Sequence, residues 1–247
     1  MSVAVAIPAR LRSSRLPRKV LTDIGGRSLL QRVHEVAVRA GCGPVVILTD
    51  ADEVAGVARA FGARVLMTDA ALQSGTARVA SVVDELDADV VVNLQGDAPL
   101  TDPDVLIRAA SEAQRSGMAV TLPVYRLENP QDVHDPATVK VVRARDGRVL
   151  YCSRAAVPFV RDAPLEAWAQ RARFWGHAGL YAYTRAFLRS FGDLPASPLE
   201  DSERLEQLRW LSAGVAIHSF EVEPQGPSVD TQIDLERVTA ALLARAS

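Results

Sequence analysis

The sequence predicts an α/β protein with a mostly parallel sheet and helices on both faces of it. Short apolar runs rich in β-branched residues alternate with amphipathic helical patterns through the first half of the chain. The runs Val3–Ile7 and Val45–Leu48 are continuously apolar, which is typical of strands that are covered on both faces. Strand, helix and strand in repeated succession favour right-handed βαβ units.

The first half of the chain supplies the expected parallel strands and their helices. The expected strands are Val3–Ile7, Val45–Leu48, Arg64–Met67 and Asp89–Leu94. A helix is expected to start near Thr76, because the apolar residues between positions 79 and 86 fall on one helical face. Asp102 followed by Pro103 is typical of an N-cap and a first helical position, and predicts a helix through about Ala113.

Closely spaced strand candidates in the second half predict an antiparallel insertion. They are Val120–Tyr125, Val139–Ala144 and Val149–Cys152. Two further strands are expected over His177–Tyr183 and Val215–Val222. The Asp146-Gly147 pair is a hairpin turn signal. Helices are expected around Leu205–Leu211 and from near Thr231, with Asp234 three residues on, to about residue 244. We expect one domain over residues 1–247, in which the β insertion occupies about 120–185.

Composition and charge exclude several classes of protein. Hydrophobic residues make up 48% and charged residues 23%, as in soluble globular proteins. With 28 basic and 30 acidic side chains the net charge is -2, so neither nucleic acid nor an anionic membrane is an expected partner. No apolar run approaches the roughly 18 residues of a spanning helix, and no signal peptide is apparent. The two cysteines form no metal or disulfide pattern, and we expect a soluble cytoplasmic protein.

The segment after the first strand is the most basic part of the chain. Residues 10–19 carry five positive charges and no acid, and neither a G-x-G-x-x-G nor a Walker A pattern is present. Ligands of α/β folds bind beyond the carboxyl ends of parallel strands. Arginine offers paired donors and lysine a compact charge, so this loop favours a polyphosphate site. The alternative is a solvated basic loop.

Two carboxylates could hold a divalent metal near this loop. Asp97 follows the fourth strand and Gly96, where a ligand can approach, and Asp230 directly precedes the last helix. Carboxylates that hold a metal on phosphate oxygens suit such positions. Each residue on its own is equally typical of a turn or a helix cap. Together with the basic loop, the pair predicts a metal–triphosphate site.

Three further segments carry weaker signals. Residues 74–78 enter a helix whose backbone N–H groups could receive a ligand, although Thr76 as a plain cap is the alternative. His177 is the histidine expected near a pocket, and the four histidines show no metal-ligand spacing. Asp50 and Asp52 resemble the D-x-D of metal-dependent sugar-nucleotide glycosyltransferases, which keeps that class as an alternative.

Taken together, these segments resemble the CMP-Kdo synthetases, the 3-deoxy-manno-octulosonate cytidylyltransferases. The matching segments are PARLRSSRLPRKVL from residue 8, QSGTAR at 73–78, NLQGDAP at 93–99, VKVV at 139–142, YCSRAAVPF at 151–159, HAGLYAY at 177–183, SPLE with LEQLR at 197–209, and VDT with DLERV at 229–238. They span almost the whole chain in family order. The resemblance therefore implies a Rossmann-like nucleotidyltransferase core, usually in a homodimer, with the insertion as dimer and sugar-site region.

The resemblance also implies a reaction and its residues. The family couples CTP to an eight-carbon acidic sugar with Mg²⁺, giving a CMP-sugar and pyrophosphate for cell-envelope polysaccharide (lipopolysaccharide) synthesis. By position, the nucleotide-binding residues would be Arg10, Ser13, Arg15, Lys19, Ser74, Gly75 and Arg78. The metal ligands would be Asp97 and Asp230, which with Lys19 form the catalytic set. The sugar would be held by Arg154, His177, Tyr181, Glu206 and Gln207.

Three positions depart from the family pattern. The family shows RLPGK, SGTER and QGDEP, where this chain has Arg18, Ala77 and Ala98. The first change adds a bulky cation to the loop, and the other two remove carboxylates near the nucleotide site. These changes leave a catalytically weak nucleotide-binding relative as a further alternative to the cytidylyltransferase.

Overall fold

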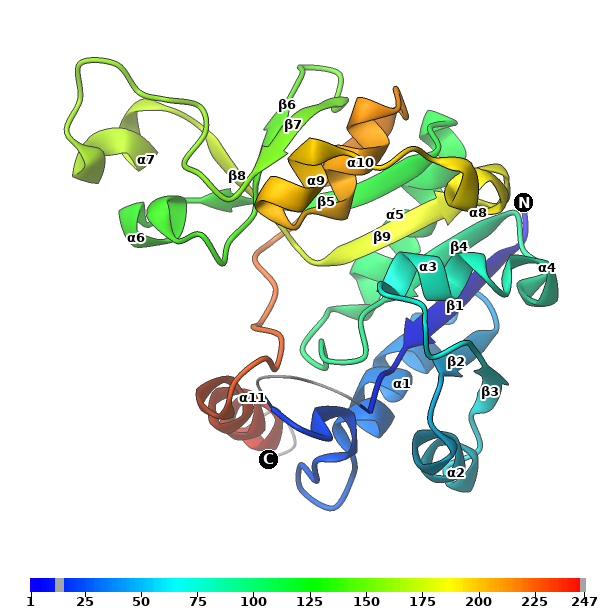
Figure 1. The fold of residues 1–247 in the computed structure, drawn as a ribbon. Coiled ribbons are helices and arrows are strands. Elements are labelled where there is room, and N and C mark those ends of the chain that lie inside the picture. Colours follow the sequence, from blue (N-terminus) through cyan, green and yellow to red (C-terminus); the bar gives the residue numbers. More distant parts are fainter. Residues whose placement is uncertain (12–15, 245–247) are drawn as a thin grey trace.

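The alternation of apolar runs and helices in the first half folds into parallel strands, as predicted. The computed structural model describes residues 1–11 and 16–244. Their ten strands form one sheet in the order β3-β2-β1-β4-β9-β5-β8-β6-β7, and β10 pairs with β5 outside this path (Figure 1). The strands are β1 (Val3–Pro8), β2 (Val45–Thr49), β3 (Arg64–Met67), β4 (Val90–Leu94), β5 (Val120–Leu127), β6 (Lys140–Arg143), β7 (Val149–Ser153), β8 (Phe174–His177), β9 (Leu180–Thr184) and β10 (Ile217–Glu221).

Helices cover both faces of this sheet. The α-helices are α1 (Leu29–Ala40), α2 (Asp52–Ala60), α3 (Gly75–Ala80), α4 (Val83–Leu86), α5 (Pro103–Ser116), α6 (Pro130–His134), α7 (Trp168–Arg171), α8 (Arg185–Ser190), α9 (Pro198–Glu203), α10 (Glu206–Ser212) and α11 (Gln232–Ala244). Within residues 1–11 and 16–244 there are also three short 3-10 helices: η1 (Lys19–Leu21), η2 (Leu165–Ala167) and η3 (Phe191–Asp193).

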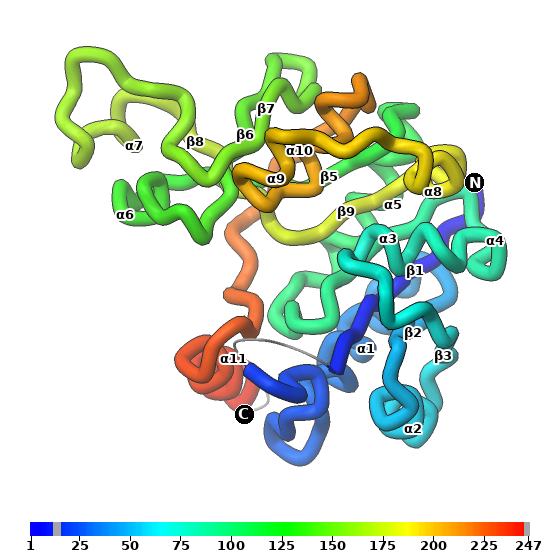
Figure 2. The backbone as a smooth tube through the Cα atoms, in the orientation of Figure 1, coloured from blue at the N-terminus to red at the C-terminus, as the bar shows by residue number. Residues whose placement is uncertain are grey.

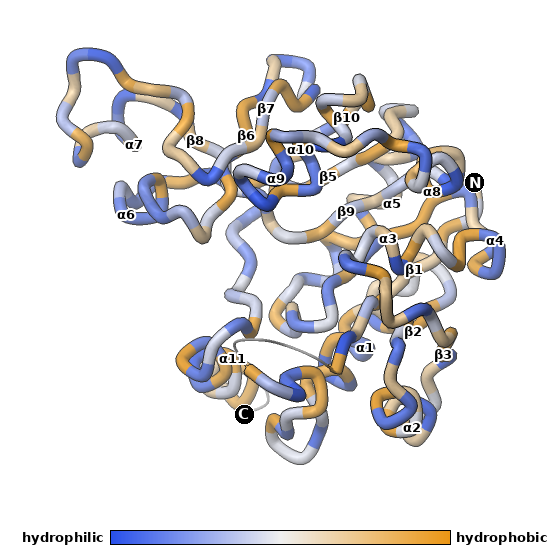
Figure 3. Tube along the Cα trace, in the orientation of Figure 1, coloured by the Kyte–Doolittle hydropathy of each residue, from blue (hydrophilic) through white to orange (hydrophobic). Residues whose placement is uncertain are grey.

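The first strand shows how the sheet divides the core into two layers. Ala4 and Ala6 of β1 pack into the cluster that includes α3, α4, α8 and α10, whereas Val5 and Ile7 pack into the cluster with α1, α2 and α5. Successive side chains of a strand point to opposite faces, so an uninterrupted apolar run serves both layers. Figure 3 shows the corresponding hydrophobic colouring along the central strands.

The strands of the second half belong to the same sheet, and their pairs are antiparallel except that β10 lies parallel to β5. Strand β9 lies between β4 and β5 and pairs antiparallel with both. The strand expected over His177–Tyr183 is two strands, since His177 ends β8 and Leu180 begins β9. Both strands run antiparallel to β5, and Gly179 between them has a φ of 71°, which favours glycine and interrupts the pairing without reversing the chain. Strand β8, which starts at Phe174, was not predicted.

Two predicted helix starts are confirmed by their caps. Asp102 Oδ1 accepts from the backbone N–H of Asp104 at 3.0 Å, with Pro103 at the first helical position of α5. Before α11, the Thr231 N–H donates to Asp234 Oδ2 at 2.9 Å, and the Asp234 N–H donates to Thr231 Oγ1 at 3.2 Å. These reciprocal bonds satisfy helix donors that would otherwise be unpaired. The helix expected from Thr76 is divided into α3 and α4.

A small apolar cluster supports a segment that projects from the sheet. Helices α6 and α7 and the backbone that leads from α7 into β8 extend away from the central strands (Figure 2). Trp168 packs there with Val133 and Phe174, and its indole N–H donates to the Ala163 carbonyl at 3.2 Å. This local core fixes the segment that precedes His177.

Candidate active site

Lys19 lies between the two carboxylates that the sequence suggested as metal ligands. Its Nζ donates to Asp97 Oδ2 at 2.6 Å, to Asp230 Oδ1 at 2.9 Å and to the Val229 carbonyl at 2.8 Å. Asp97 follows β4, and Asp230 precedes α11. The Val229 N–H donates to the Asp97 carbonyl at 2.8 Å, which holds the two segments together. The structure therefore places Lys19 in direct contact with both Asp97 and Asp230, the other two residues of the predicted catalytic set.

Burial and charge act against each other in this cluster. The side chains of Lys19, Asp97 and Asp230 are 12%, 24% and 42% exposed. Burial lowers the pKa of Lys19, but the neighbouring Asp97 and Asp230 outweigh it, and the pKa is raised overall. Burial raises the pKa of Asp97, and Lys19 offsets only part of that rise. The site is thus a partly buried pair of carboxylates that needs a cation.

The donor set also fits magnesium by its chemistry. Two carboxylates and one backbone carbonyl surround a cationic nitrogen here, and Mg²⁺ prefers such hard oxygen ligands. Among residues 1–11 and 16–244, no group of three or more His, Cys, Asp or Glu side chains could hold a metal. A metal at Asp97 and Asp230 would take its remaining ligands from water and substrate phosphates, as Mg²⁺ commonly does.

In the described part of the basic loop, the side chains of Arg10 and Arg18 contact different segments of the protein. The Arg10 guanidinium donates to the Leu72 carbonyl, next to the segment that starts α3. Arg18 is exposed and pairs with Glu53 of α2. Its φ of 58° is in the left-handed region, which explains why a glycine suits this position better. Ser13 and Arg15 lie outside the described residues.

The start of α3 places the other predicted nucleotide residues. Ser74 caps the helix by accepting from the Ala77 N–H at 3.1 Å. Gly75 faces Gln95, and a Cβ at Gly75 would lie 3.3 Å from the Gln95 side chain. The helix start therefore lies against the loop that carries Asp97.

Arg78 is fully buried. Its guanidinium donates to Thr68 Oγ1, and its Nη2 lies 3.6 Å from Asp50 Oδ2. Burial lowers its pKa, Asp50 opposes that shift and Arg10 adds to it. In this arrangement Arg78 supports the ends of β2 and β3, so its nucleotide contact stays a prediction.

A cavity of about 270 Å³ gathers most of the predicted sugar residues. It is lined by Gly75, Gln95, Val139, His177, Gly179, Tyr181, Arg204, Leu205, Glu206 and Gln207. The Tyr181 hydroxyl accepts from Gln207 Nε2, and Glu206 Oε2 accepts from Thr76 Oγ1 at 2.8 Å. Burial raises the pKa of Glu206, although hydrogen bonds from Ser74 and Thr76 oppose it. The cavity thus presents fixed donors and acceptors of the kind that sugar hydroxyls need.

His177 contributes a neutral ring to this cavity. Burial lowers its pKa to about 4, and its Nε2 donates to the Leu180 carbonyl at 3.2 Å. The ring also lies against Tyr181, with centroids 4.8 Å apart. A neutral imidazole can form a hydrogen bond with an uncharged hydroxyl, but it supplies no positive charge for a carboxylate.

Arg154 is not brought to the cavity. Its Nε donates to the Glu203 carbonyl at 2.7 Å, and its Nη1 donates to the Pro136 carbonyl at 2.9 Å. Arg204 lines the cavity instead, from a left-handed turn with a φ of 53°. Sequence reasoning passed over Arg204, which has no motif signal. It also passed over Gln95, although the NLQGDAP segment contains it.

Asp50 and Asp52 do not form the metal pair that the glycosyltransferase alternative requires. Asp50 faces the buried Arg78, whereas Asp52 is exposed in the first turn of α2. Their spacing therefore reflects the end of β2 and the start of a helix.

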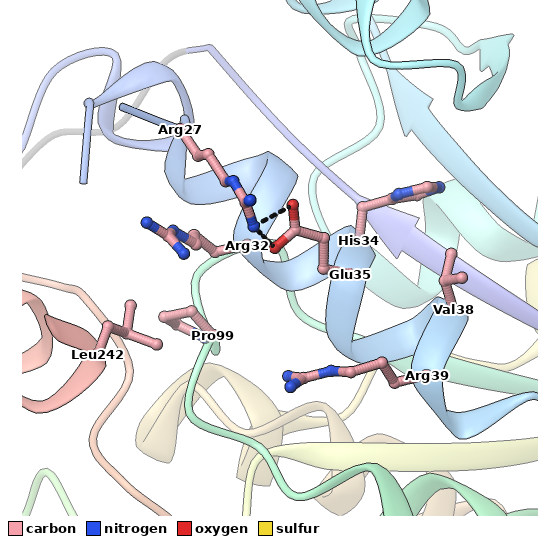
Figure 4. A pocket seen from close by; sticks show the side chains of 8 residues that line it. All are labelled: Arg27, Arg32, His34, Glu35, Val38, Arg39, Pro99 and Leu242. Carbon is pink, nitrogen blue, oxygen red and sulfur yellow. Dashed lines mark hydrogen bonds and ion pairs between the residues drawn. The ribbon is translucent and has the colours of Figure 1, made fainter. Parts of the chain in front are cut away.

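Two larger cavities contain none of the predicted site residues. One of about 570 Å³ lies between α1, the loop at Pro99 and α11 (Figure 4). Its Arg27 is paired with Glu35 at 2.9 Å, and the side chain of Arg39 is directed toward Pro99. Another of about 540 Å³ is lined by both arginines and glutamates, Arg126 and Glu128 among them. Size alone therefore does not locate the site.

Comparison with known proteins agrees with this geometry. A sequence model described as cytidylyltransferase matches residues 4–217. The 3-deoxy-manno-octulosonate cytidylyltransferase of Thioalkalivibrio sulfidiphilus is 43% identical over 99% of this chain and 100% of its own length. The chain belongs to this family. The Haemophilus influenzae member is 39% identical over 99% of this chain and all of its own.

One solved structure is similar to the chain in both sequence and fold, and another is similar in fold alone. A CMP:2-keto-3-deoxy-manno-octonic acid synthetase complexed with CTP superposes with a TM-score of 0.93 and 37% identity, over 99% of this chain and 100% of the other. A glucose-1-phosphate thymidylyltransferase from Bacillus anthracis, named as putative in its description, shares the fold alone, with a TM-score of 0.67 and 15% identity over 97% of this chain and 95% of the other. The predicted nucleotidyltransferase core is confirmed. None of the helices in the described residues is long and apolar enough to cross a membrane.

Proposed function

We propose that this protein transfers the cytidylyl group of CTP to 3-deoxy-manno-octulosonate (Kdo), giving CMP-Kdo and pyrophosphate. The names of the relatives and the CTP complex of the similar synthetase support this reaction. One observation in the chain itself carries it. Gln95 lines the sugar-side cavity, and Asp97, two residues on, pairs with Lys19, so one loop joins both halves of the site.

In this reaction the anomeric hydroxyl oxygen attacks the α-phosphorus of CTP. A new oxygen–phosphorus bond forms, the bond to the bridging oxygen breaks, and pyrophosphate leaves with that electron pair while the hydroxyl loses its proton. Arg10 and Lys19 supply positive charge at the strand ends for the triphosphate. Glu206 and Gln207 orient the sugar hydroxyls. Positioning and charge neutralisation provide most of the acceleration in such transfers.

Asp97 and Asp230 are the residues that would hold Mg²⁺. The ion supplies neutralisation of charge on the phosphate oxygens when it is bound. The placement of the two carboxylates and the Val229 carbonyl around one cationic nitrogen supports this assignment. The role of this chain's residues is to fix both carboxylates: β4 anchors the Asp97 loop, and the capped start of α11 anchors Asp230.

An assay of pyrophosphate release with CTP, Mg²⁺ and Kdo tests the proposal, with CMP-Kdo identified by mass spectrometry. Activity should require the sugar and disappear with a chelator. ATP, GTP and hexose 1-phosphates should be poor substrates. Equal turnover with ATP or full activity without metal contradicts the cytidylyltransferase. Turnover orders of magnitude below that of the relatives favours the catalytically weak alternative, in which Ala77 and Ala98 replace carboxylates.

We further propose a homodimer that works in the cytoplasm in cell-envelope polysaccharide synthesis. The projecting segment exposes Phe159 and Leu165, which are 77% and 54% accessible. Large exposed apolar side chains on one projection are typical of a surface that another chain covers. Light scattering after size exclusion should give the mass of two chains, and Phe159→Ser should shift it toward one.

A further inference from the structure

A chain of hydrogen bonds through the interior joins two residues that line the sugar-side cavity. Gln95 Nε2 donates to Asn93 Oδ1 at 3.2 Å, and Asn93 Nδ2 donates to the Tyr183 hydroxyl at 3.4 Å. The Tyr183 hydroxyl lies 2.9 Å from Thr76 Oγ1, which donates to Glu206 Oε2 at 2.8 Å. Gln95 and Glu206 line the cavity, and the three residues between them are buried. The interior of the protein therefore connects two parts of the cavity wall.

The donors of this chain all run in one direction. Glu206 accepts from Thr76, and a threonine hydroxyl has a single proton, so Thr76 can only accept from Tyr183. The proton of the Tyr183 hydroxyl is then also used, and its oxygen accepts from Asn93 Nδ2. The Asn93 amide oxygen consequently faces Gln95 and accepts from its Nε2. The Glu206 carboxylate thus determines, through four hydrogen bonds, how the Gln95 amide is turned.

Tyr183 is held rigidly in the middle of the chain. Its ring stacks on Phe187, with centroids 5.6 Å apart, and meets Trp210 edge-on at 5.9 Å. Its strand β9 pairs with β4, which carries Asn93. Aromatic packing and strand pairing therefore fix the position of the hydroxyl relative to the Asn93 amide.

The Gln95 amide keeps one acceptor for a ligand. Its Nε2 donates to Asn93, and none of the residues in 1–11 and 16–244 donates to its Oε1. The side chain is half-buried where it lines the cavity. A half turn of an unrestrained amide would exchange its oxygen and its nitrogen, whereas the bond to Asn93 keeps the oxygen available. An amide oxygen accepts hydrogen bonds from hydroxyl groups, which a sugar has in number.

We propose that Tyr183 is a positioning residue for the sugar, which acts through Asn93 to hold the Gln95 amide so that Oε1 accepts from a sugar hydroxyl. This inference rests on the sugar substrate given in the proposed function. Tyr183 is fully buried and acts without touching the sugar. Without its hydroxyl, Asn93 Nδ2 loses its acceptor, and the two amides are free to turn together. The cavity would then present an N–H where the sugar needs an acceptor.

Tyr183→Phe tests this role, because it keeps the ring and removes the hydroxyl. The KM for Kdo at saturating CTP should rise roughly 2- to 10-fold, the loss expected for one neutral hydrogen bond. The KM for CTP and kcat should change less than about twofold, because the sugar contact is the same before and during transfer. Ser219→Ala is the matched control, since it removes another buried hydroxyl, which donates to the Gly147 carbonyl at 2.7 Å. That variant should keep the wild-type KM for Kdo.

A double-mutant cycle shows whether the effect passes through Gln95. In a Gln95→Ala background, Tyr183→Phe should change the KM for Kdo by less than about twofold, because the group that it positions is absent. An effect of full size in that background would act through Thr76 and Glu206 or through the fold, and overturns the inference. Thermal melting verifies that each variant is folded.

The two asparagines of the sequence allow a readout without substrates. Selective labelling of asparagine side chains gives two NH₂ groups in NMR spectra, those of Asn93 and Asn129. Asn129 is an internal control, because it is exposed and caps α6. The Asn93 signal should move or broaden in Tyr183→Phe and in Gln95→Ala, whereas the Asn129 signal should stay in place. An unchanged Asn93 signal in either variant overturns the inference.

The outcomes separate this inference from the proposed function. The NMR samples contain neither CTP nor Kdo, so they report on the hydrogen bonds of Asn93 whether or not the reaction occurs. Failure of the proposed function appears as no CMP-Kdo from the wild type. Failure of the inference appears in an active enzyme, as a wild-type KM for Kdo in Tyr183→Phe.

Discussion

Thr76 and Glu206 are joined by a hydrogen bond of 2.8 Å between Oγ1 and Oε2, which connects the start of α3 to the start of α10. Thr76 Oγ1 also lies 2.9 Å from the Tyr183 hydroxyl. The residue that sequence reasoning treated as a plain cap therefore connects the predicted nucleotide side of the site to the sugar-side cavity. Ser74 is the residue that caps α3.

Thr76→Val should destabilise the protein, because the shape is kept while Glu206 and Tyr183 each lose a partner. Leaving buried polar groups short of a hydrogen bond costs roughly 1–3 kcal/mol. Urea unfolding measures the loss. Thr121→Val is a matched control, since its buried Oγ1 has no partner among the described residues. That variant should be neutral or slightly stabilised, and equal losses in both would show that the Thr76 bond contributes little.

Asp97→Asn and Asp230→Asn should each lower kcat by about 100-fold or more, as removal of a charge-stabilising group commonly does. The amide keeps the shape but loses the charge that holds a hard cation. Steady-state assays with CTP and Kdo measure the effect, with melting temperatures to verify folding. Asp52→Asn is the control from the glycosyltransferase alternative and should keep near-normal turnover. Loss of activity in Asp52→Asn alone would reverse the choice between the two classes.

The sequence predicted well those elements that depend only on residues close together in the chain. The continuous apolar run of β1 and the Thr231–Asp234 capping box needed only neighbouring residues, and both are confirmed. The position of β9 between β4 and β5 depends on pairing between distant segments. Hydrophobic periodicity carries no information on which strand pairs with which. The insertion was therefore expected, but its place inside the main sheet was not.

In the candidate site, too, some residues were predicted from the sequence and others were not. Lys19 is 78 residues from Asp97 and 211 residues from Asp230. The basic loop and the two carboxylates suggested a metal–triphosphate site, and the family resemblance singled out Lys19 as part of the catalytic set. Arg154 was assigned to the sugar from its position in the YCSRAAVPF segment of the family resemblance. Its side chain donates to the main-chain carbonyls of Glu203 and Arg204, at the left-handed turn that Arg204 forms. No sequence motif signals that turn.

Arg204→Gln should therefore raise the KM for Kdo by roughly 10- to 100-fold, the loss expected for a charged hydrogen bond. The KM for CTP and the melting temperature should change little, because Arg204 is exposed. Arg154→Gln should instead lower stability, since it loses its bonds to main-chain carbonyls. The Kdo methyl ester, which lacks the charge, should be insensitive to Arg204→Gln. The reverse result, with a KM effect confined to Arg154→Gln, would return the carboxylate to Arg154.

Burial of His177 makes the free energy of unfolding depend on pH. Its pKa is lowered to about 4 by burial, whereas an unfolded chain titrates its histidines near 6.5. Between these values the unfolded state binds more protons, so stability is complete above about pH 6.5 and falls as the pH drops toward 4. The contribution of His177 should amount to roughly 2 kcal/mol between pH 7 and pH 5.

Urea unfolding at pH 7 and pH 5 measures this dependence. His177→Gln should lose less stability on acidification than the wild type, by about the 2 kcal/mol that protonation of His177 costs. His134→Gln, a change outside the cavity, should lose as much stability between pH 7 and pH 5 as the wild type does. Because carboxylates titrate alike in all three proteins, they cancel in the comparison. Identical pH dependence in the wild type and His177→Gln would mean that His177 titrates normally, and that a charged ring could then face the sugar carboxylate.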